Sequence, residues 1–147
     1  MKNKKGFTLV ELLAVIVVLA LLALLAGNAV GNMISKSQWN TFKTDALTVA
    51  KAAETAYEVG KLEGTAKTTY SCKDLIDLGY LELDNTNYEE LKTANSSKCK
   101  VDISDTETKV TLKNTSNKYY VSGAKKDLIA QDEFGKDSTN QIQKATN

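Results

Sequence analysis

The feature that most constrains this chain is an apolar run near its N-terminus, FTLVELLAVIVVLALLALLA, from Phe7 to Ala26. As a helix that rises about 1.5 Å per residue, such a run spans roughly the 30 Å hydrocarbon core of a bilayer. It contains one charged residue, Glu11, and no Lys, Arg or His. A carboxylate at such a depth is costly, and by default it is a functional residue that needs a partner. The run therefore predicts a helix covered by lipid or by other protein, with Glu11 as its candidate functional residue.

The residues before the run indicate where a partner for Glu11 could come from. The segment from Met1 to Gly6 is short, basic and free of acids, which is typical of the cytoplasmic flank of a membrane helix. Glu11 lies four residues after Phe7, about one helical turn. Cleavage between Gly6 and Phe7 would create an amine at Phe7. That amine could pair with Glu11 of the same chain or of an adjacent one.

The string KKGFTLVELL, from Lys4 to Leu13, resembles the class III signal of type IV pilins and of type II secretion pseudopilins. The resemblance implies that a membrane prepilin peptidase cleaves after Gly6 and N-methylates Phe7. It also implies that Glu11 neutralises the amine of a neighbouring subunit during assembly.

Two other interpretations of the N-terminus stay open. One is an ordinary secretory signal, with Gly27-Asn28-Ala29 as the small-residue site and cleavage after Ala29. The other is a membrane anchor that stays uncut. Neither accounts for the placement of Gly6, Phe7 and Glu11.

Composition excludes several function classes. The 147 residues fit one small domain plus an anchor. Residues 1–6 hold three of the 19 basic residues, so their removal leaves 16 against 18 acidic ones, a net charge of about −2. This balance does not indicate a nucleic-acid surface, except in the case of a DNA-uptake pseudopilin. The chain lacks His, a phosphate-binding loop and a Ser/His/Asp set, so we expect neither an enzyme nor a cofactor.

Cysteine and acid patterns give two further expectations about the region beyond the membrane segment. Cys72 and Cys99 are expected to form a disulfide if this region is extracellular, with two free thiols as the alternative. We predict no metal site. Two sulfurs without His make a zinc site improbable. A calcium site from Asp132, Glu133 and Asp137 is the alternative.

The helical pattern continues beyond the apolar run. Apolar residues recur three to five positions apart and form one stripe of an amphipathic helix. These are Ile34, Trp39, Phe42, Ala46, Val49, Ala53 and Ala56 or Tyr57. Gly60 and Gly64 then suit a helix end near Val59. We therefore predict one helix from Phe7 to Val59, with a stem at residues 7–31 that is apolar all round and an amphipathic half at residues 32–59.

The chain contains no proline, and Gly27 and Gly31 fall in the stem where many type IV pilins carry one. Glycine costs up to about 1 kcal/mol per residue inside a helix, so this stretch is the weakest part of the stem. Either the helix kinks or melts here on assembly, or the glycines allow close helix packing.

Residues 60–147 are expected to form a head with a small antiparallel sheet. Ser71 to Leu81 predicts a short helix that ends at Gly79. Apolar and polar residues alternate over residues 98–104 and 108–114, and Tyr119 to Val121 continues the pattern, which predicts a three-stranded meander. The apolar stripe of the long helix is expected to cover this sheet. Leu128, Ile129 and Phe134 are candidate anchors for a tail that is otherwise loose.

These observations predict an α+β fold in which a long N-terminal helix packs on a small antiparallel sheet, similar to pilins. The resemblance implies a pilin that polymerises into an extracellular helical fibre for adhesion, motility or surface attachment. Its partners would be other pilins, the prepilin peptidase, the inner-membrane assembly machinery and, before assembly, the membrane. The alternatives are a pseudopilin of a secretion or DNA-uptake system and an anchored binding domain that never polymerises.

Overall fold

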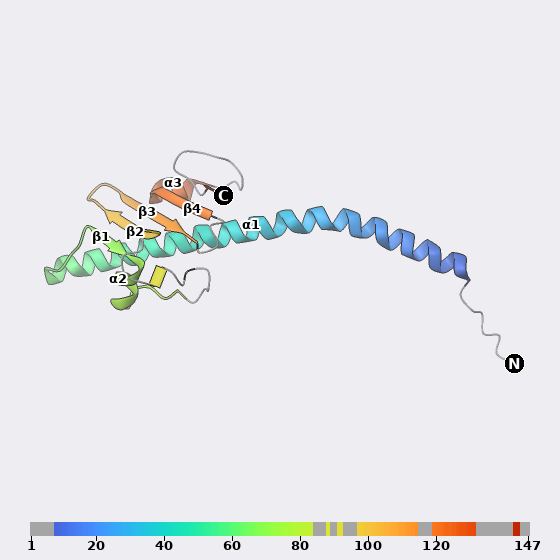
Figure 1. The fold of residues 1–147 in the computed structure, drawn as a ribbon. Coiled ribbons are helices and arrows are strands. Elements are labelled where there is room, and N and C mark those ends of the chain that lie inside the picture. The colour runs from blue at the N-terminus through green and yellow to red at the C-terminus, as the bar shows by residue number, and fades with distance from the viewer. Residues whose placement is uncertain are drawn as a thin grey trace. The chain divides into compact units, whose positions relative to one another are not determined.

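The computed structural model describes residues 8–83, 88, 91–92, 97–114, 119–131 and 143–144, and within these ranges it describes only the backbone at residues 26, 28, 29, 32, 143 and 144. The chain divides into two compact units, Met1–Ser37 and Gln38–Asn147, and we call the second the globular unit. The elements are α1 (Leu9–Glu63), β1 (Thr69–Ser71), α2 (Cys72–Asp77), β2 (Cys99–Ile103), β3 (Thr108–Lys113), β4 (Tyr119–Ala124), α3 (Lys125–Ala130) and β5 (Gln143–Lys144) (Figure 1).

Helix α1 ends at a different glycine from the one the sequence suggested. It continues through Gly60 to Glu63, and Gly64 follows with a φ of 74°, the left-handed conformation that terminates helices. The predicted end near Val59 is therefore wrong. Gly60 instead gives the returning chain room to approach, since a Cβ atom at Gly60 would lie 2.8 Å from the Cα atom of Ala66. The carbonyl of Gly60 accepts hydrogen bonds from the backbone N–H groups of Thr65 and Ala66.

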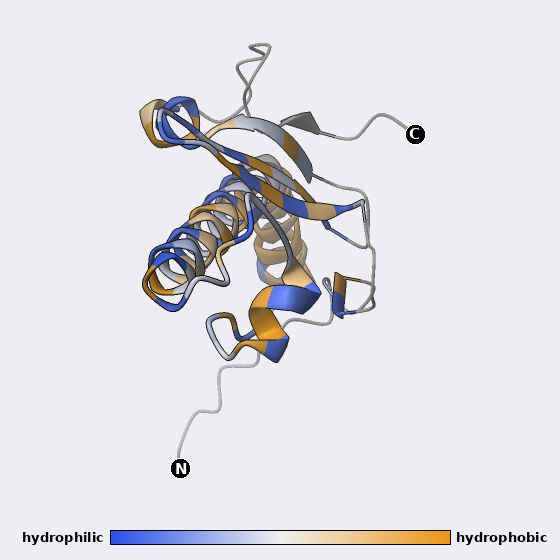
Figure 2. Ribbon diagram, turned by 90° about the vertical axis from the view of Figure 1, so that its left-hand side faces the viewer, coloured by the Kyte–Doolittle hydropathy of each residue, from blue (hydrophilic) through white to orange (hydrophobic). Residues whose placement is uncertain are grey.

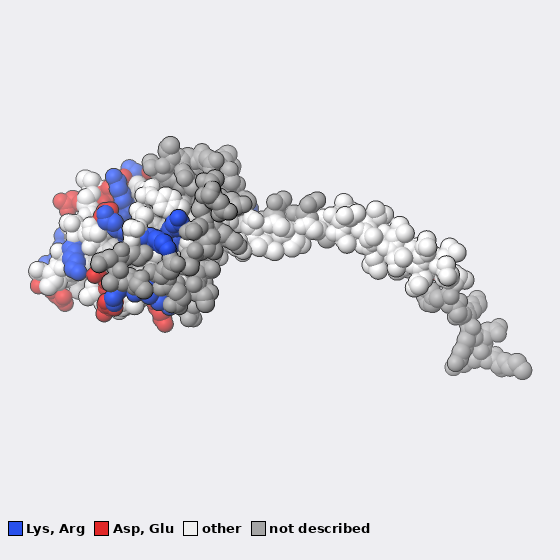
Figure 3. Space-filling model, viewed as in Figure 1, with Lys and Arg blue, Asp and Glu red and all other residues white. Residues whose placement is uncertain are grey.

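The apolar residues of the stem are exposed on every side of the helix. All residues from Leu9 to Leu25 are exposed, and the large apolar side chains among them range from 49% exposed at Val15 to 81% at Leu9. Figure 3 shows only uncharged described atoms on the visible face of this part of α1. Among the described residues, we find no helix that is both long and apolar enough to cross a membrane.

Gly27 and Gly31 lie within α1, and a Cβ built at either position would meet no described atom within 4 Å apart from the local helix backbone and the adjacent residues. A kink, a melted segment or close packing of another helix at these glycines therefore stays a prediction for the assembled state.

In the globular unit, α1 buries the predicted apolar stripe. The buried residues of α1 are Trp39, Phe42, Ala46, Val49, Ala50, Ala52, Ala53 and Ala56. Small residues dominate the second half of this stripe, which lets the helix approach the sheet closely. Ile34, which the sequence also placed on the stripe, is 51% exposed, so the buried stripe begins at Trp39.

The predicted meander is the centre of a larger sheet. Strands β2, β3 and β4 pair antiparallel as expected, with Val101 opposite Val110 and Leu112 opposite Val121. The full strand order is β1-β2-β3-β4-β5. The prediction of three strands is therefore wrong, because it missed the two short edge strands, β1 and β5. The sheet and α2 lie on opposite sides of α1, and Figure 2 shows apolar and polar residues alternating along the strands.

The inward residues of the strands complete the core with the α1 stripe, and Tyr119 packs its ring 5.7 Å from that of Phe42, centroid to centroid. This arrangement confirms the α+β fold in which the long helix covers an antiparallel sheet. Tyr88 and Leu91, which belong to a largely undescribed segment, are also buried in this core.

The residues after β4 are partly as predicted. Leu128 is fully buried, whereas Ile129 is 53% exposed and does not anchor the chain, and Phe134 lies outside the described residues. Lys43 of α1 donates hydrogen bonds to the backbone carbonyls of Ile129 and Gln131, at the end of α3. The two residues of β5 pair with β4, so the expected loose tail adds a strand at this point.

A disulfide and a polar cluster link these elements. Cys72, at the start of α2, is bonded to Cys99, at the start of β2, with Cα atoms 5.5 Å apart and both residues buried. Glu54 of α1 accepts hydrogen bonds from Thr108 of β3 and from Lys125 of α3. Both links join segments that are far apart in the sequence.

Candidate assembly site at the start of helix α1

The predicted functional carboxylate lies in the first turn of α1. Thr8 is the residue before the helix, and its carbonyl accepts the first helical hydrogen bond from Leu12 at 3.2 Å. Thr8 is therefore the N-cap of α1, and Glu11 is its third helical residue. Both residues are exposed. The local fold follows from residue type, because threonine favours the N-cap and an acid favours the positive end of the helix dipole.

Thr8 and Glu11 hydrogen-bond each other reciprocally. The Oε2 atom of Glu11 accepts from the backbone N–H and from the hydroxyl of Thr8, each at 2.8 Å. The backbone N–H of Glu11 in turn donates to Thr8 Oγ1 at 3.3 Å. This is a capping box, which satisfies backbone donors that the first turn of a helix leaves unpaired. The sequence signal for this box is Thr-x-x-Glu at residues 8–11, and it was missing from the predicted site.

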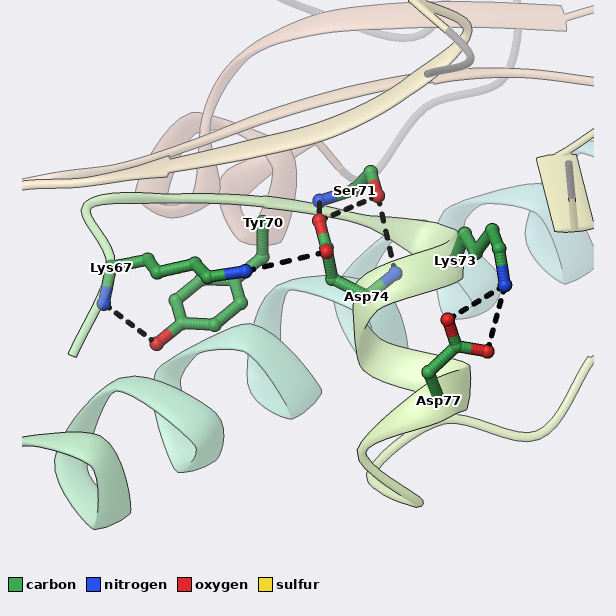
Figure 4. A network of polar contacts seen from close by, with 6 residues as sticks. All are labelled: Lys67, Tyr70, Ser71, Lys73, Asp74 and Asp77. Carbon is green, nitrogen blue, oxygen red and sulfur yellow. Dashed lines mark hydrogen bonds and ion pairs between the residues drawn. The ribbon is translucent and has the colours of Figure 1, made fainter. Parts of the chain in front are cut away.

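The chain contains a second capping box, at the start of α2 in the globular unit. Ser71 donates from its backbone N–H and its hydroxyl to Asp74 Oδ2, at 2.9 and 2.7 Å, and accepts from the N–H of Asp74 at 3.2 Å (Figure 4). The hydrogen bonds from Ser71 hold the pKa of Asp74 below its usual range, with a smaller contribution from Lys67. Lys67 pairs with the other carboxylate oxygen of Asp74 at 3.5 Å.

The two boxes differ at the oxygen that the cap does not use. Within the described ranges, Glu11 Oε1 has no hydrogen-bond partner, whereas the equivalent oxygen of Asp74 faces Lys67. The box at the start of α1 is therefore a capped helix terminus in which no described residue contacts the second carboxylate oxygen.

The structure brings together only part of the predicted site. Gly6 and Phe7 lie outside the described residues. Gly27 is 16 residues beyond Glu11, about 24 Å along the helix, and Gly31 is farther still. Neither Gly27 nor Gly31 therefore contributes to the first turn. Cys72 and Cys99 lie in the globular unit and belong to its core.

The described part of the globular unit was compared with this terminus for metal-binding groups and cavities. This part contains no group of three side chains suited to hold a metal ion, and Asp132, Glu133 and Asp137 lie outside it. A cavity of about 250 Å³ lies among the end of α1, the turn at Thr65–Lys67 and α2, lined by Val59, Glu63, Tyr70, Asp77 and Tyr80 among others. It is smaller than the cavities that hold drug-sized ligands, of about 300–1,000 Å³.

Comparison with known proteins locates a family motif on this end of the chain. Residues 1–27 match the family model described as the prokaryotic N-terminal methylation motif. Neither the curated proteins nor the solved structures contain a match to the chain. Gly6, Phe7, Thr8 and Glu11 all fall inside the matched segment.

The motif and the fold together define a class. The chain carries the class III signal segment of type IV pilins and pseudopilins, and its architecture is pilin-like, with a long N-terminal helix on an antiparallel sheet. The motif match covers the N-terminal segment, and together with the fold it supports a relation to type IV pilins or pseudopilins.

Proposed function

We propose that this protein is a pilin, cleaved after Gly6 and polymerised into a type IV pilus. One observation carries the proposal: the methylation motif is joined to a helix whose described residues from Leu9 to Leu25 are all exposed. An apolar surface of this extent, exposed on every side, requires an apolar environment. Lipid supplies it before assembly, and the stems of neighbouring copies supply it within the fibre.

The assembly step follows from the chemistry of the first turn. Cleavage leaves an amine on Phe7, and methylation preserves its positive charge. In the apolar fibre core, this amine and the Glu11 carboxylate of a neighbouring copy neutralise each other. A stem docked at another height along its neighbour would leave both charges unpaired. The pair therefore selects the register between neighbouring stems. Repeated head-to-tail contacts of this kind generate an open helix.

This function implies the partners and the location. The prepilin peptidase processes the chain, and the inner-membrane assembly machinery extracts it from the membrane, where residues 7–26 anchor it. Other copies and other pilins then hold it in a fibre on the cell surface. The uses that such a fibre serves are adhesion, motility and attachment to surfaces.

A pseudopilin of a secretion or DNA-uptake system is the second candidate, because the same methylation motif serves both groups. The sheet of the globular unit, with five strands, favours the true pilin. A membrane-anchored binding domain that never polymerises is the alternative from a different class.

Replacement of Glu11 tests the proposal. Glu11→Ala should abolish surface fibres while the processed protein still reaches the membrane at the wild-type level. The matched control is Glu63→Ala, at an exposed glutamate at the other end of the same helix, which should leave fibres unchanged. Fibre yield is measured in sheared surface fractions and compared with the membrane pool. Normal fibres from the Glu11 variant would contradict the assembly role.

A further inference from the structure

The cavity at the end of α1 has an apolar wall that solvent reaches. Tyr70 is buried, whereas Leu78 is 54% exposed and Tyr80 is 36% exposed, and all three line the cavity. Its volume is about 250 Å³. At roughly 30 Å³ per water molecule, this volume corresponds to about eight waters. The cavity is therefore on the scale of one sugar ring.

The polar wall of the cavity carries carboxylates whose charge is largely compensated. Glu63, Asp74 and Asp77 line the cavity together with Lys67. Lys67 pairs with Asp74 at 3.5 Å, and Lys73 pairs with Asp77 at 2.6 Å (Figure 4). A carboxylate has about four lone-pair sites, so an ion-paired one can still accept from a further donor. The wall thus offers more to hydroxyl groups than to a free ion.

We propose that this cavity binds one neutral sugar ring. A pyranose ring has an apolar C–H face and an edge of hydroxyl groups. The C–H face fits the side chains of Leu78 and Tyr80, and the hydroxyl groups can donate to the carboxylate of Asp77. An apolar surface with a few convergent polar groups is the usual composition of a small-molecule site. The inference rests on the proposed function, because it gives the adhesion of a fibre a ligand of stated chemistry.

Saturation-transfer NMR on sheared fibres tests this inference. The probes are the methyl glycosides of glucose, galactose, mannose and N-acetylglucosamine, and n-butylammonium chloride is the cationic comparison. We expect transfer to the ring C–H protons of at least one glycoside and none to butylammonium. Transfer to butylammonium alone, or to no probe, would overturn the inference.

Two variants locate the binding. Tyr80→Ala removes an aromatic wall and should weaken glycoside binding by about tenfold. Thr65→Trp, at an exposed position of the lining, should fill the cavity and weaken binding at least as much. The matched control is Tyr120→Ala, at a half-buried tyrosine of β4 outside the lining, which should stay within about twofold of the wild type. Glycoside binding that survives both cavity variants would contradict the assignment.

Fibre yield separates this inference from the proposed function. Tyr80→Ala and Thr65→Trp should assemble at the wild-type level, because the cavity lies in the globular unit and not in the apolar stem. Normal fibres that bind no glycoside would refute the sugar site and leave the proposed function standing. The same measurement on the full chain in the sugar-free detergent lauryldimethylamine oxide tests the cavity even if no fibres form, a result that would contradict the proposed function alone.

Discussion

At the scale of single residues, the same capping box occurs at the start of two helices. Thr8 with Glu11 and Ser71 with Asp74 form the same reciprocal hydrogen bonds at the start of a helix. Lys67 forms an ion pair with the carboxylate of Asp74. Among the described residues no cation pairs with Glu11, and assembly is the role that we propose for it.

Ser71→Ala should destabilise the globular unit by about 1 kcal/mol at neutral pH, the usual cost of a lost N-cap. The pKa of Asp74 is lowered in the folded state, so its stabilising contribution is present above the unfolded pKa and is lost as the pH falls through the folded value. The difference from the wild type should therefore shrink in acid, below about pH 4. Urea unfolding at several pH values measures it.

Thr55→Ala is the control for that experiment, since the hydroxyl of Thr55 donates only within its own helix, to the carbonyl of Lys51. It should shift stability by less than about 0.5 kcal/mol. A Ser71→Ala effect that stays constant down to pH 2 would show that Asp74 does not contribute through its charge.

At the scale of elements, the end of α1 depends on two glycines with different roles. Gly64 adopts the left-handed conformation that ends the helix, and Gly60 lets the returning chain pass close by. Gly60→Ala should destabilise the globular unit by about 1–3 kcal/mol because the new methyl group overlaps the backbone of Ala66. Chemical denaturation of the globular unit measures the loss.

Gly27→Ala is the matched change in the same helix, at a position where an added Cβ meets nothing. It should leave unfolding of the globular unit unchanged. Equal denaturation midpoints for the Gly60 variant and the wild type would contradict the close approach of Ala66.

The disulfide joins β2 to α2 across a sequence separation of 27 residues. In the chain-entropy picture, a loop of this length contributes about 3–4 kcal/mol. The double variant Cys72→Ala/Cys99→Ala should lose stability of this order, as judged by denaturant unfolding. The secreted protein, unfolded without reductant, should accept no alkylating label. Two labelled thiols would show that the bridge is not formed.

The sequence predicted the elements whose patterns are long and regular. The helical stripe from Trp39 to Ala56 and the alternation in β2 and β3 each repeat several times, so their type and buried face were clear. Strands β1 and β5 have three and two residues, too few to show a period, and only pairing with neighbours defines them. The site was predicted as Glu11 with the amine at Phe7, and Thr8 was missed because it was counted with the apolar run rather than as a cap.

At the scale of the whole molecule, the sequence divides the chain between two environments. Up to Leu25 the helix exposes apolar side chains on all sides, and from Trp39 onward its apolar stripe is buried in the core of the globular unit. In the proposed pilus, the apolar stem requires lipid or other copies around it. The globular unit carries a surface with charges of both signs (Figure 3). Under this proposal, the stem is the part that polymerises and the globular unit is the part that meets the medium.

The central claim is that this N-terminus is processed as a pilin, and the mass of the mature N-terminal peptide tests it most directly. Protein purified from its native membrane or fibre is digested, and the first peptide is identified by mass spectrometry. We predict a peptide that begins at Phe7 and carries one N-methyl group. A peptide that begins at Met1, or at Val30 after cleavage behind Ala29, would contradict the account.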